Sequence, residues 1–275
     1  MSSPIHTETL WINTPHGRLF CRRWCPTQRA ESPQPPPIIL FHDSLGCVAL
    51  WRDFPEQLCQ TTGREVIAYD RLGFGQSDAY PGSLPQSFIR DEAERFFGYL
   101  KAALQIERFV ALGHSVGGAM TAACASLYPQ DCQALITIAA QAFVEERTLQ
   151  GIRAAELQFQ QPGQMARLQK YHGDKADWVL GAWTRTWLAE TFRGWTIEGS
   201  VGEVQCPVLA LHGEQDEYGS VEHPVRIGKL SMVEGECLIV EGCGHVLHRE
   251  APGVVLGAVG GFLGHVISTG LPRRP

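Results

Sequence analysis

Short apolar runs alternate along the chain with longer segments whose apolar residues repeat at helical spacing. A run without polar alternation is typical of a strand that is buried on both faces of a parallel sheet. Such runs lie at residues 37–42, 65–70, 109–112, 134–140, 207–213 and 236–240. Two earlier segments, 8–13 and 18–25, flank a Pro-His-Gly turn and predict an antiparallel hairpin. Together these patterns predict an α/β fold with a doubly wound, mostly parallel sheet of eight strands.

The segments between the predicted strands carry the spacing of helices. These helices are expected at residues 50–61, 88–104, 119–125 and 224–230, with a final one at 253–269. The final helix has five interior glycines, and each costs roughly 1 kcal/mol relative to alanine where it is exposed. Close packing of this helix against the sheet is one arrangement that offsets the cost.

The alternation of strand and helix stops between residues 142 and 203. This stretch is polar, rich in aromatic residues and without a buried-strand run. Helices are expected at 145–161, 165–171 and 174–190, separated by Pro-Gly and His-Gly pairs. We therefore expect a core domain made of residues 1–141 and 204–275, with 142–203 as a helical insertion after the sixth strand.

The strand at 109–112 leads into Gly113-x-Ser115-x-Gly117 and then directly into a helix of small residues. This order of elements is typical of a nucleophile elbow, a sharp strand-to-helix turn that exposes its central serine. An ordinary turn is the competing interpretation. The elbow places the following amide, that of Val116, and the helix N-terminus next to any oxyanion that develops.

A serine hydroxyl needs a histidine base, which a carboxylate orients. In elbow-containing sheets the acid and the histidine follow the serine in that order, on loops after later strands. Asp216 follows the strand that ends at Gly213, with Glu214 and Glu217 as competing carboxylates, and His245 follows the last strand. These positions predict Ser115, Asp216 and His245 as the catalytic residues, although Asp216 as a turn residue and His245 as a loop histidine are the structural alternatives.

Three further histidines are expected to be structural. His42 is expected to brace its own loop through hydrogen bonds, and the ring of His114 is expected to pack beside its strand. His248 follows His245 by three residues and is expected to be structural as well.

An oxyanion hole needs two backbone N–H donors, one after the nucleophile and one from the loop after an earlier buried strand. Val116 supplies the first. The loop at 42–46 supplies the second, with Ser44 as the preferred donor and Leu45 as the alternative.

The chain resembles the α/β-hydrolase fold superfamily over nearly its whole length. The matching motifs lie at residues 41–46, 70–78, 113–118, 211–216 and 244–245. The resemblance implies that 142–203 is a helical cap, or lid, that covers the site and selects the substrate. One residue departs from the family pattern, since Asp43 stands where the family has glycine. Asp43 would reshape the oxyanion loop or place a carboxylate at the pocket mouth.

A serine at position 115 separates this chain from the dehalogenases and epoxide hydrolases of the superfamily, which use aspartate. The resemblance therefore implies a serine hydrolase of a small carboxylic ester or lactone, an esterase-like or lactonase-like enzyme. The alternatives are a thioesterase, a hydrolase of C–C bonds in dienoic ring-fission products, and a cofactor-free haloperoxidase-like or dioxygenase-like enzyme. Transfer to an acceptor other than water and a non-catalytic, ligand-binding α/β-hydrolase also stay open.

Aromatic residues are dense in the 142–203 segment. They either anchor the cap to the core or line an apolar substrate pocket. Trp183 and Trp187 are spaced i, i+4 on one helix face and are named as candidate substrate contacts, whereas Trp178 lies off that face.

Composition narrows the class of partner. The 275 residues carry a formal net charge of −6, which argues against nucleic-acid binding. No signal peptide or run of bilayer length is visible, and the nine cysteines show no framework or zinc spacing. We expect a cytoplasmic protein with buried thiols, including Cys124, Cys206 and Cys237, no metal and no cofactor. The expected partner is a small-molecule substrate, neither nucleic acid nor membrane, and the chain is either a monomer or a homodimer.

Overall fold

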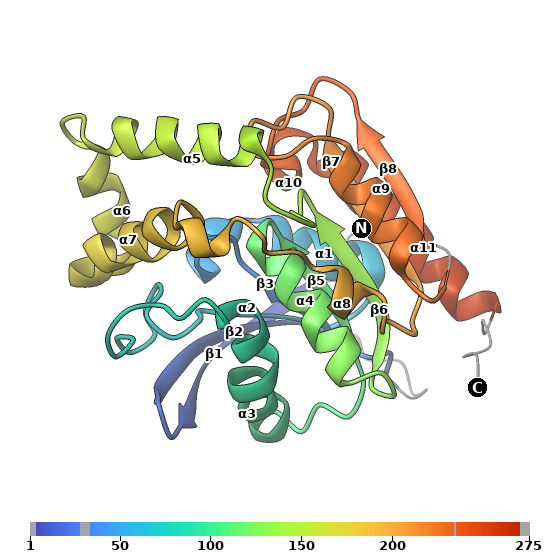
Figure 1. Ribbon diagram of the computed structural model, residues 1–275. Coiled ribbons are helices and arrows are strands. Elements are labelled where there is room, and N and C mark those ends of the chain that lie inside the picture. Colours follow the sequence, from blue (N-terminus) through green and yellow to red (C-terminus); the bar gives the residue numbers. More distant parts are fainter. Residues whose placement is uncertain (1–3, 28–33, 234, 270–275) are drawn as a thin grey trace.

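Eight strands in the described part of the chain form one sheet in the order β1-β2-β4-β3-β5-β6-β7-β8 (Figure 1). The computed structural model describes residues 4–27, 34–233 and 235–269. The strands are β1 (Ile5–Thr14), β2 (Gly17–Pro26), β3 (Ile38–Phe41), β4 (Val66–Tyr69), β5 (Phe109–His114), β6 (Cys132–Ile138), β7 (Val208–Gly213) and β8 (Glu236–Val240). β1, β2 and β4 pair antiparallel, and all later pairs are parallel. The predicted eight-stranded, mostly parallel sheet is confirmed.

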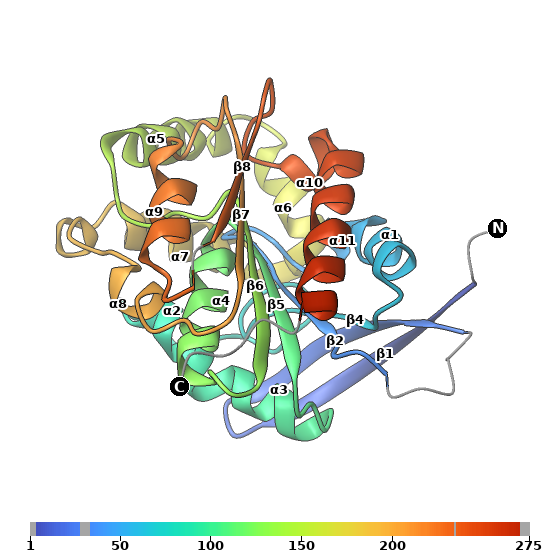
Figure 2. The same cartoon turned by 90° about the vertical axis from the view of Figure 1, so that its right-hand side faces the viewer.

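The buried strands feed two separate cores, because successive side chains point to opposite faces of a sheet. Ile39 and Phe41 pack into one core, and Ile38 and Leu40 into the other. α1 and α11 cover one face and α4 the other (Figure 2). The helices of the core are α1 (Phe54–Thr62), α2 (Phe88–Asp91), α3 (Phe97–Ala103), α4 (Val116–Leu127), α9 (Glu222–Leu230), α10 (Leu247–Glu250) and α11 (Pro252–Thr269).

The helix expected at 88–104 is a run of three elements. α2 passes into a π turn, η2 (Glu92–Phe96), and then into α3. Glu92 lies in the π turn, is buried, and accepts a 2.7 Å hydrogen bond from the Tyr69 hydroxyl. The helix expected at 50–61 similarly begins as a separate 3-10 turn, η1 (Val48–Trp51), before α1.

The segment between β6 and β7 is helical, as its polar and aromatic pattern predicts. It contains α5 (Glu146–Phe159), α6 (Gln164–His172), η3 (Gly173–Lys175), α7 (Ala176–Trp187), η4 (Glu190–Phe192) and α8 (Glu198–Val201). α5, α6 and α7 pack against one another and project to one side of the sheet in Figure 1, whereas α8 packs against α4 and α9.

Eight of the nine cysteines are buried, and none in the described residues forms a disulfide. The expectation of a buried thiol is wrong for Cys237, which is exposed. Cys237 lies on β8, the edge strand, where Glu236, Cys237 and Leu238 are all exposed. An apolar run alone does not distinguish such an edge strand from an interior one.

Close packing does not account for most of the glycines of α11. A Cβ at Gly253, Gly257, Gly261 or Gly264 would meet no atom within 4 Å, and only Gly260 approaches a neighbour, 3.1 Å from Thr61 Cγ2. Gly257 and Gly261 are exposed on the helix surface. These two positions therefore carry the entropic cost of glycine without a packing gain.

We predict that Gly257→Ala and Gly261→Ala each raise the free energy of unfolding by about 0.5–1 kcal/mol, because alanine loses less backbone entropy in a helix. Denaturant unfolding measures the change. Gly260→Ala is the matched control, because its new methyl group would crowd Thr61 Cγ2 at 3.1 Å, so a smaller gain is expected. An unchanged or lower stability for both exposed variants would contradict the prediction.

Candidate active site

A strained backbone turn presents Ser115 at the end of β5. Ser115 has φ 55° and ψ −126°, and α4 begins at the next residue. The flanking glycines are required by space, because a Cβ on Gly113 would lie 2.2 Å from the Gly117 carbonyl oxygen, and one on Gly117 would lie 2.1 Å from that of Phe41. Positive φ is uncommon for a residue other than glycine and is found at functional sites. The local structure is the elbow that the sequence predicts.

Asp216 and His245 meet although they are far apart in the sequence. Each follows a parallel strand, β7 or β8, and the carboxyl ends of such strands share one edge of the sheet. The two atoms His245 Nδ1 and Asp216 Oδ2 are 2.8 Å apart. The Asp216 carboxylate is buried and also accepts from the amides of Tyr218, at 2.7 Å, and Gly219, at 3.2 Å.

The two competing carboxylates contact the backbone instead of the imidazole. Glu214 accepts from the amide of Gly242 at 3.1 Å, and Glu217 accepts from the amide of His245 at 3.3 Å. The structure therefore brings Asp216, among the three acidic candidates, to the histidine ring.

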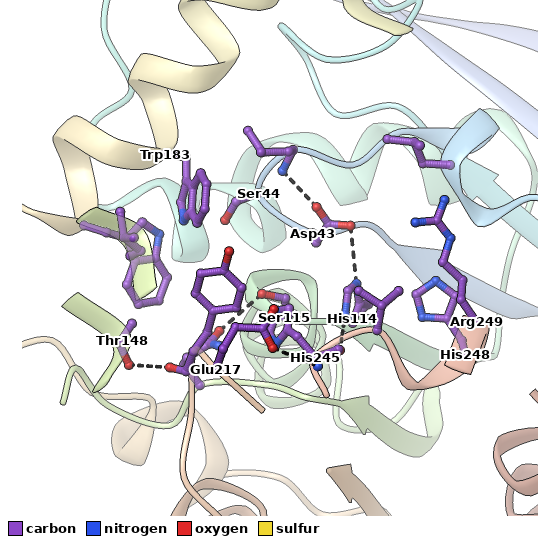
Figure 3. Close-up of a pocket in the computed structure, with 17 residues that line it drawn as sticks. Asp43, Ser44, His114, Ser115, Thr148, Trp183, Glu217, His245, His248 and Arg249 are labelled. Atoms are coloured by element: carbon purple, nitrogen blue, oxygen red, sulfur yellow. Dashed lines mark hydrogen bonds and ion pairs between the residues drawn. The ribbon is translucent and has the colours of Figure 1, made fainter. Parts of the chain in front are cut away.

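Ser115 and His245 line the same cavity (Figure 3), and Asp216 contacts the His245 ring without lining this cavity. Within the described residues, the Ser115 hydroxyl donates to Gln141 Oε1 at 3.4 Å and not to His245. Catalytic hydrogen bonds are often long or misaligned before a substrate binds.

The environment of His245 favours its protonated form. Burial opposes protonation, but the hydrogen bond and charge of Asp216, together with the charges of Glu217 and Asp43, outweigh burial and raise the pKa of His245. Burial likewise opposes ionisation of Asp216, yet His245, His212 and the Tyr218 amide lower the pKa of its carboxyl group. The carboxylate is thus charged beside the histidine at neutral pH.

The loop after β3 is braced by His42, as expected. His42 Nδ1 donates to the Asp43 carbonyl at 2.8 Å, and its Nε2 accepts from the amide of Arg71 at 3.1 Å. Burial holds the pKa of His42 well below its usual value, which suits a neutral ring with one donor and one acceptor. Ser44 of this loop lines the cavity beside Ser115, and Val116 lines a small adjoining cavity together with Ser44.

Asp43 both shapes this loop and faces the cavity. Its Oδ1 accepts from the amide of Leu45 at 2.9 Å, and its Oδ2 lies 3.3 Å from His114 Nδ1. Burial opposes ionisation of Asp43, but the hydrogen bond and charge of His114 help to hold the pKa of this carboxyl well below its usual range. His114 Nε2 in turn donates to the backbone carbonyl of His245 at 2.9 Å. His114 therefore links the loop after β3 to the loop that carries His245. The sequence predicted only that its ring packs beside the strand.

The cavity has a volume of about 280 Å³ and is lined by both apolar and polar side chains (Figure 3). Its apolar and aromatic lining includes Leu45, Ile152, Trp183, Trp187 and Tyr218, and its polar lining includes Asp43, Glu217, His248 and Arg249. Trp183 and Trp187 of α7 thus reach the cavity. Trp178 instead stacks on Tyr80 and donates to the Gly82 carbonyl at 2.7 Å.

Gln141 and Tyr218 line the cavity but were not selected from the sequence. Gln141 is the first polar side chain after the apolar run at 134–140, and Tyr218 comes two residues after Asp216. The rule that selected Asp216 and His245, which takes polar residues just after a buried strand, would have selected Gln141 as well.

No group of three or more His, Cys, Asp or Glu side chains in residues 4–27, 34–233 and 235–269 could hold a metal ion. No helix in these residues is long and apolar enough to cross a membrane.

The chain belongs to the family described as alpha/beta hydrolase fold, which matches residues 36–174. Human 1-acylglycerol-3-phosphate O-acyltransferase ABHD5 is 30% identical over 113 residues, which are 41% of this chain and 32% of that protein. Serine hydrolase BPHL of Mus musculus is 29% identical over 174 residues, 60% of this chain and 58% of that protein. The chain therefore spans about a third to three fifths of the length of these curated relatives.

Solved structures show the same fold. A proline iminopeptidase of Mycobacterium smegmatis has a TM-score of 0.69 and 22% identity, over 94% of this chain and 98% of that one. The carboxylesterase CesB (YbfK) of Bacillus subtilis has a TM-score of 0.68 and 20% identity, over 94% and 92%.

Burial keeps some histidines neutral, so the stability of the fold is expected to fall in acid. Burial and the charge of His114 lower the pKa of His248 to about 2, and burial lowers that of His223 to about 4. Both groups bind protons more readily when the chain is unfolded, near the reference pKa of about 6.5. Their contribution to stability is therefore present above pH 6.5 and is lost as the pH falls.

We predict that the free energy of unfolding falls between pH 6.5 and 4.5, and that His248→Phe weakens this dependence. Phenylalanine takes no proton, so the slope should drop by about 1.4 kcal/mol per pH unit. The ring contacts of His248 with Trp51 and Phe54 suit an aromatic replacement. Urea unfolding at several pH values measures the slope, and equal slopes for both proteins would contradict the prediction.

Proposed function

We propose that the protein is a serine hydrolase that cleaves a small carboxylic ester or lactone through an acyl-enzyme on Ser115. The observation that carries the proposal is the 2.8 Å contact of His245 with buried Asp216, where His245 lines the same cavity as the strained Ser115. A strained serine, a histidine and a buried carboxylate are the components of nucleophilic acyl transfer.

Each group has a distinct role in the proposed acylation. The Asp216 carboxylate accepts a hydrogen bond from Nδ1–H of His245. Nε2 of His245 is then unprotonated and acts as the base for Ser115. Ser115 Oγ attacks the carbonyl carbon, and the amides of Ser44 and Val116 hold the oxyanion, each contributing about 3 kcal/mol. His245 then gives its proton to the leaving oxygen, and water later releases the acyl group by the same path in reverse.

We also propose that the 142–203 segment is a cap that selects the substrate. α5 contributes Ile152 and α7 contributes Trp183 and Trp187 to the cavity wall. Trp187 also packs edge-on against Phe192 and Trp195, at 5.3 and 5.6 Å between ring centroids. Trp187 thus both packs within the segment and lines the cavity. The cavity of about 280 Å³ suits a small substrate with an apolar part.

The names of the relatives support acyl chemistry but not one substrate. They include a serine hydrolase, a carboxylesterase, a proline iminopeptidase and an acyltransferase. We would compare kcat/KM across esters, lactones, thioesters and dienoate ketones to separate the proposed activity from the alternative substrates. An alcohol added as a competing acceptor tests for transfer to an acceptor other than water.

The first test is covalent labelling. A fluorophosphonate probe should label the wild-type protein, and Ser115→Ala should abolish labelling and lower kcat by at least about a thousandfold. Intact-protein mass spectrometry and ester hydrolysis are the measurements. A folded wild-type protein that resists the probe would instead support a ligand-binding role.

The second test is the pH profile. The base must be neutral, so kcat/KM should fall as the pH drops through the raised pKa of His245, above about 6.5. Glu217→Gln removes one charge that raises this pKa, so its acid limb should move to lower pH while activity is retained.

Asp216→Asn is the contrasting variant, because it removes the hydrogen-bond partner of His245 and should lower kcat by about 10³–10⁴-fold. An equal loss in Glu217→Gln would contradict the assignment of Asp216 as the acid.

A further inference from the structure

Gln141 is a buried amide that faces the nucleophile. Its exposure is 3%, it lines the cavity, and its Oε1 lies 3.4 Å from Ser115 Oγ. Within the described residues, this contact is the only hydrogen bond of the side chain. An amide group can make about four hydrogen bonds, and buried polar groups are normally satisfied. The remaining capacity of Gln141 is therefore directed to whatever occupies the cavity.

The backbone on both sides fixes where this amide points. Ala139 has φ 51°, and its amide donates to the Leu211 carbonyl at 2.8 Å. The amide of Ala142 donates to His223 Nδ1 at 3.0 Å, and its carbonyl accepts from the amide of Ile197 at 2.8 Å. Gln141 thus lies between two tethered residues.

The sheet order decides which side of Ser115 the amide occupies. β3, with the Ser44 loop, lies on one side of β5, and β6, β7 and β8 lie on the other. Gln141, after β6, therefore shares the side of His245, and Figure 3 places Ser44 and His245 on opposite sides of Ser115. The oxyanion would face Ser44, so the leaving group, and later the attacking water, would face His245 and Gln141.

We propose that Gln141 is a further catalytic residue, which holds the hydrolytic water during deacylation. This inference rests on the proposed acyl-enzyme. Water has two O–H groups, and one gives its proton to His245 Nε2 as the oxygen attacks the acyl carbon. The other donates to Gln141 Oε1 and orients the attack. His245 then returns the proton to Ser115 Oγ as the Oγ–acyl bond breaks, and the carboxylic acid leaves.

The arrangement also predicts a preference for water over alcohols. Methanol has a single O–H, which His245 must take, and its methyl group cannot donate to Gln141. Loss of the amide should therefore slow hydrolysis of the acyl-enzyme more than its methanolysis.

The test uses 4-nitrophenyl acetate and the full chain. Gln141→Met keeps the shape of the side chain and removes its hydrogen bonds, and Gln141→Leu is the second variant. Rapid mixing should show a burst of 4-nitrophenolate close to one per enzyme, followed by turnover at least about tenfold slower than in the wild type. In added methanol, the ratio of methyl acetate to acetate should rise. Gln150→Leu makes the same kind of change at an exposed position of α5 and should leave rates and ratio unchanged.

The outcomes separate this inference from the proposed function. If the wild type forms no acyl-enzyme on Ser115, the proposed function fails. If it does, but folded Gln141 variants keep the wild-type ratio of methyl acetate to acetate, the role of Gln141 is overturned, even where all rates fall together. Failure of both variants to fold would assign Gln141 a structural role and overturn the proposal as well.

Discussion

The site depends on the close approach of three backbone segments, which are the end of β5, the start of α4 and the end of β3. The chain at Gly117 lies so near Phe41 of β3, and Gly113 so near Gly117, that neither position has room for a Cβ. This crowding leaves Ser115 with a positive φ, and its amide is tied to the Ile138 carbonyl of β6 at 2.8 Å. The position of the serine relative to the loops after β3 and β6 is therefore determined by the sheet itself.

Buried histidines connect the loops around this turn. His42 and His114 hold the loop after β3, and His114 also reaches the backbone of His245. His212 lies 3.4 Å from Asp216 Oδ2 and contacts the Gly219 carbonyl at 3.0 Å. These rings hold the loops around Ser115, Asp216 and His245, and burial lowers the pKa of His42 and His212. The network that supports the proposed chemistry thus makes the fold sensitive to acid.

Aromatic residues of the 142–203 segment both pack against one another and line the cavity. Trp183 contacts the ring of Tyr218, which in turn contacts the ring of His245 at 4.8 Å. A substrate that fits against these rings is therefore held next to the proposed base. Asp43, Glu217 and Arg249 add charged groups to the lining of the same cavity.

The sequence by itself determined the sheet, the elbow and the candidates Ser115, Asp216 and His245. It could do so because parallel strands bring the loops after them to one edge, so order along the chain predicts proximity in space. Only the tertiary structure decided that Asp216 and not Glu217 meets the ring, that Trp183 and not Trp178 reaches the cavity, that Cys237 is exposed, and that the Gln141 amide faces Ser115. Local patterns name candidates for these positions, but the outcomes depend on the packing and orientation of side chains from distant segments.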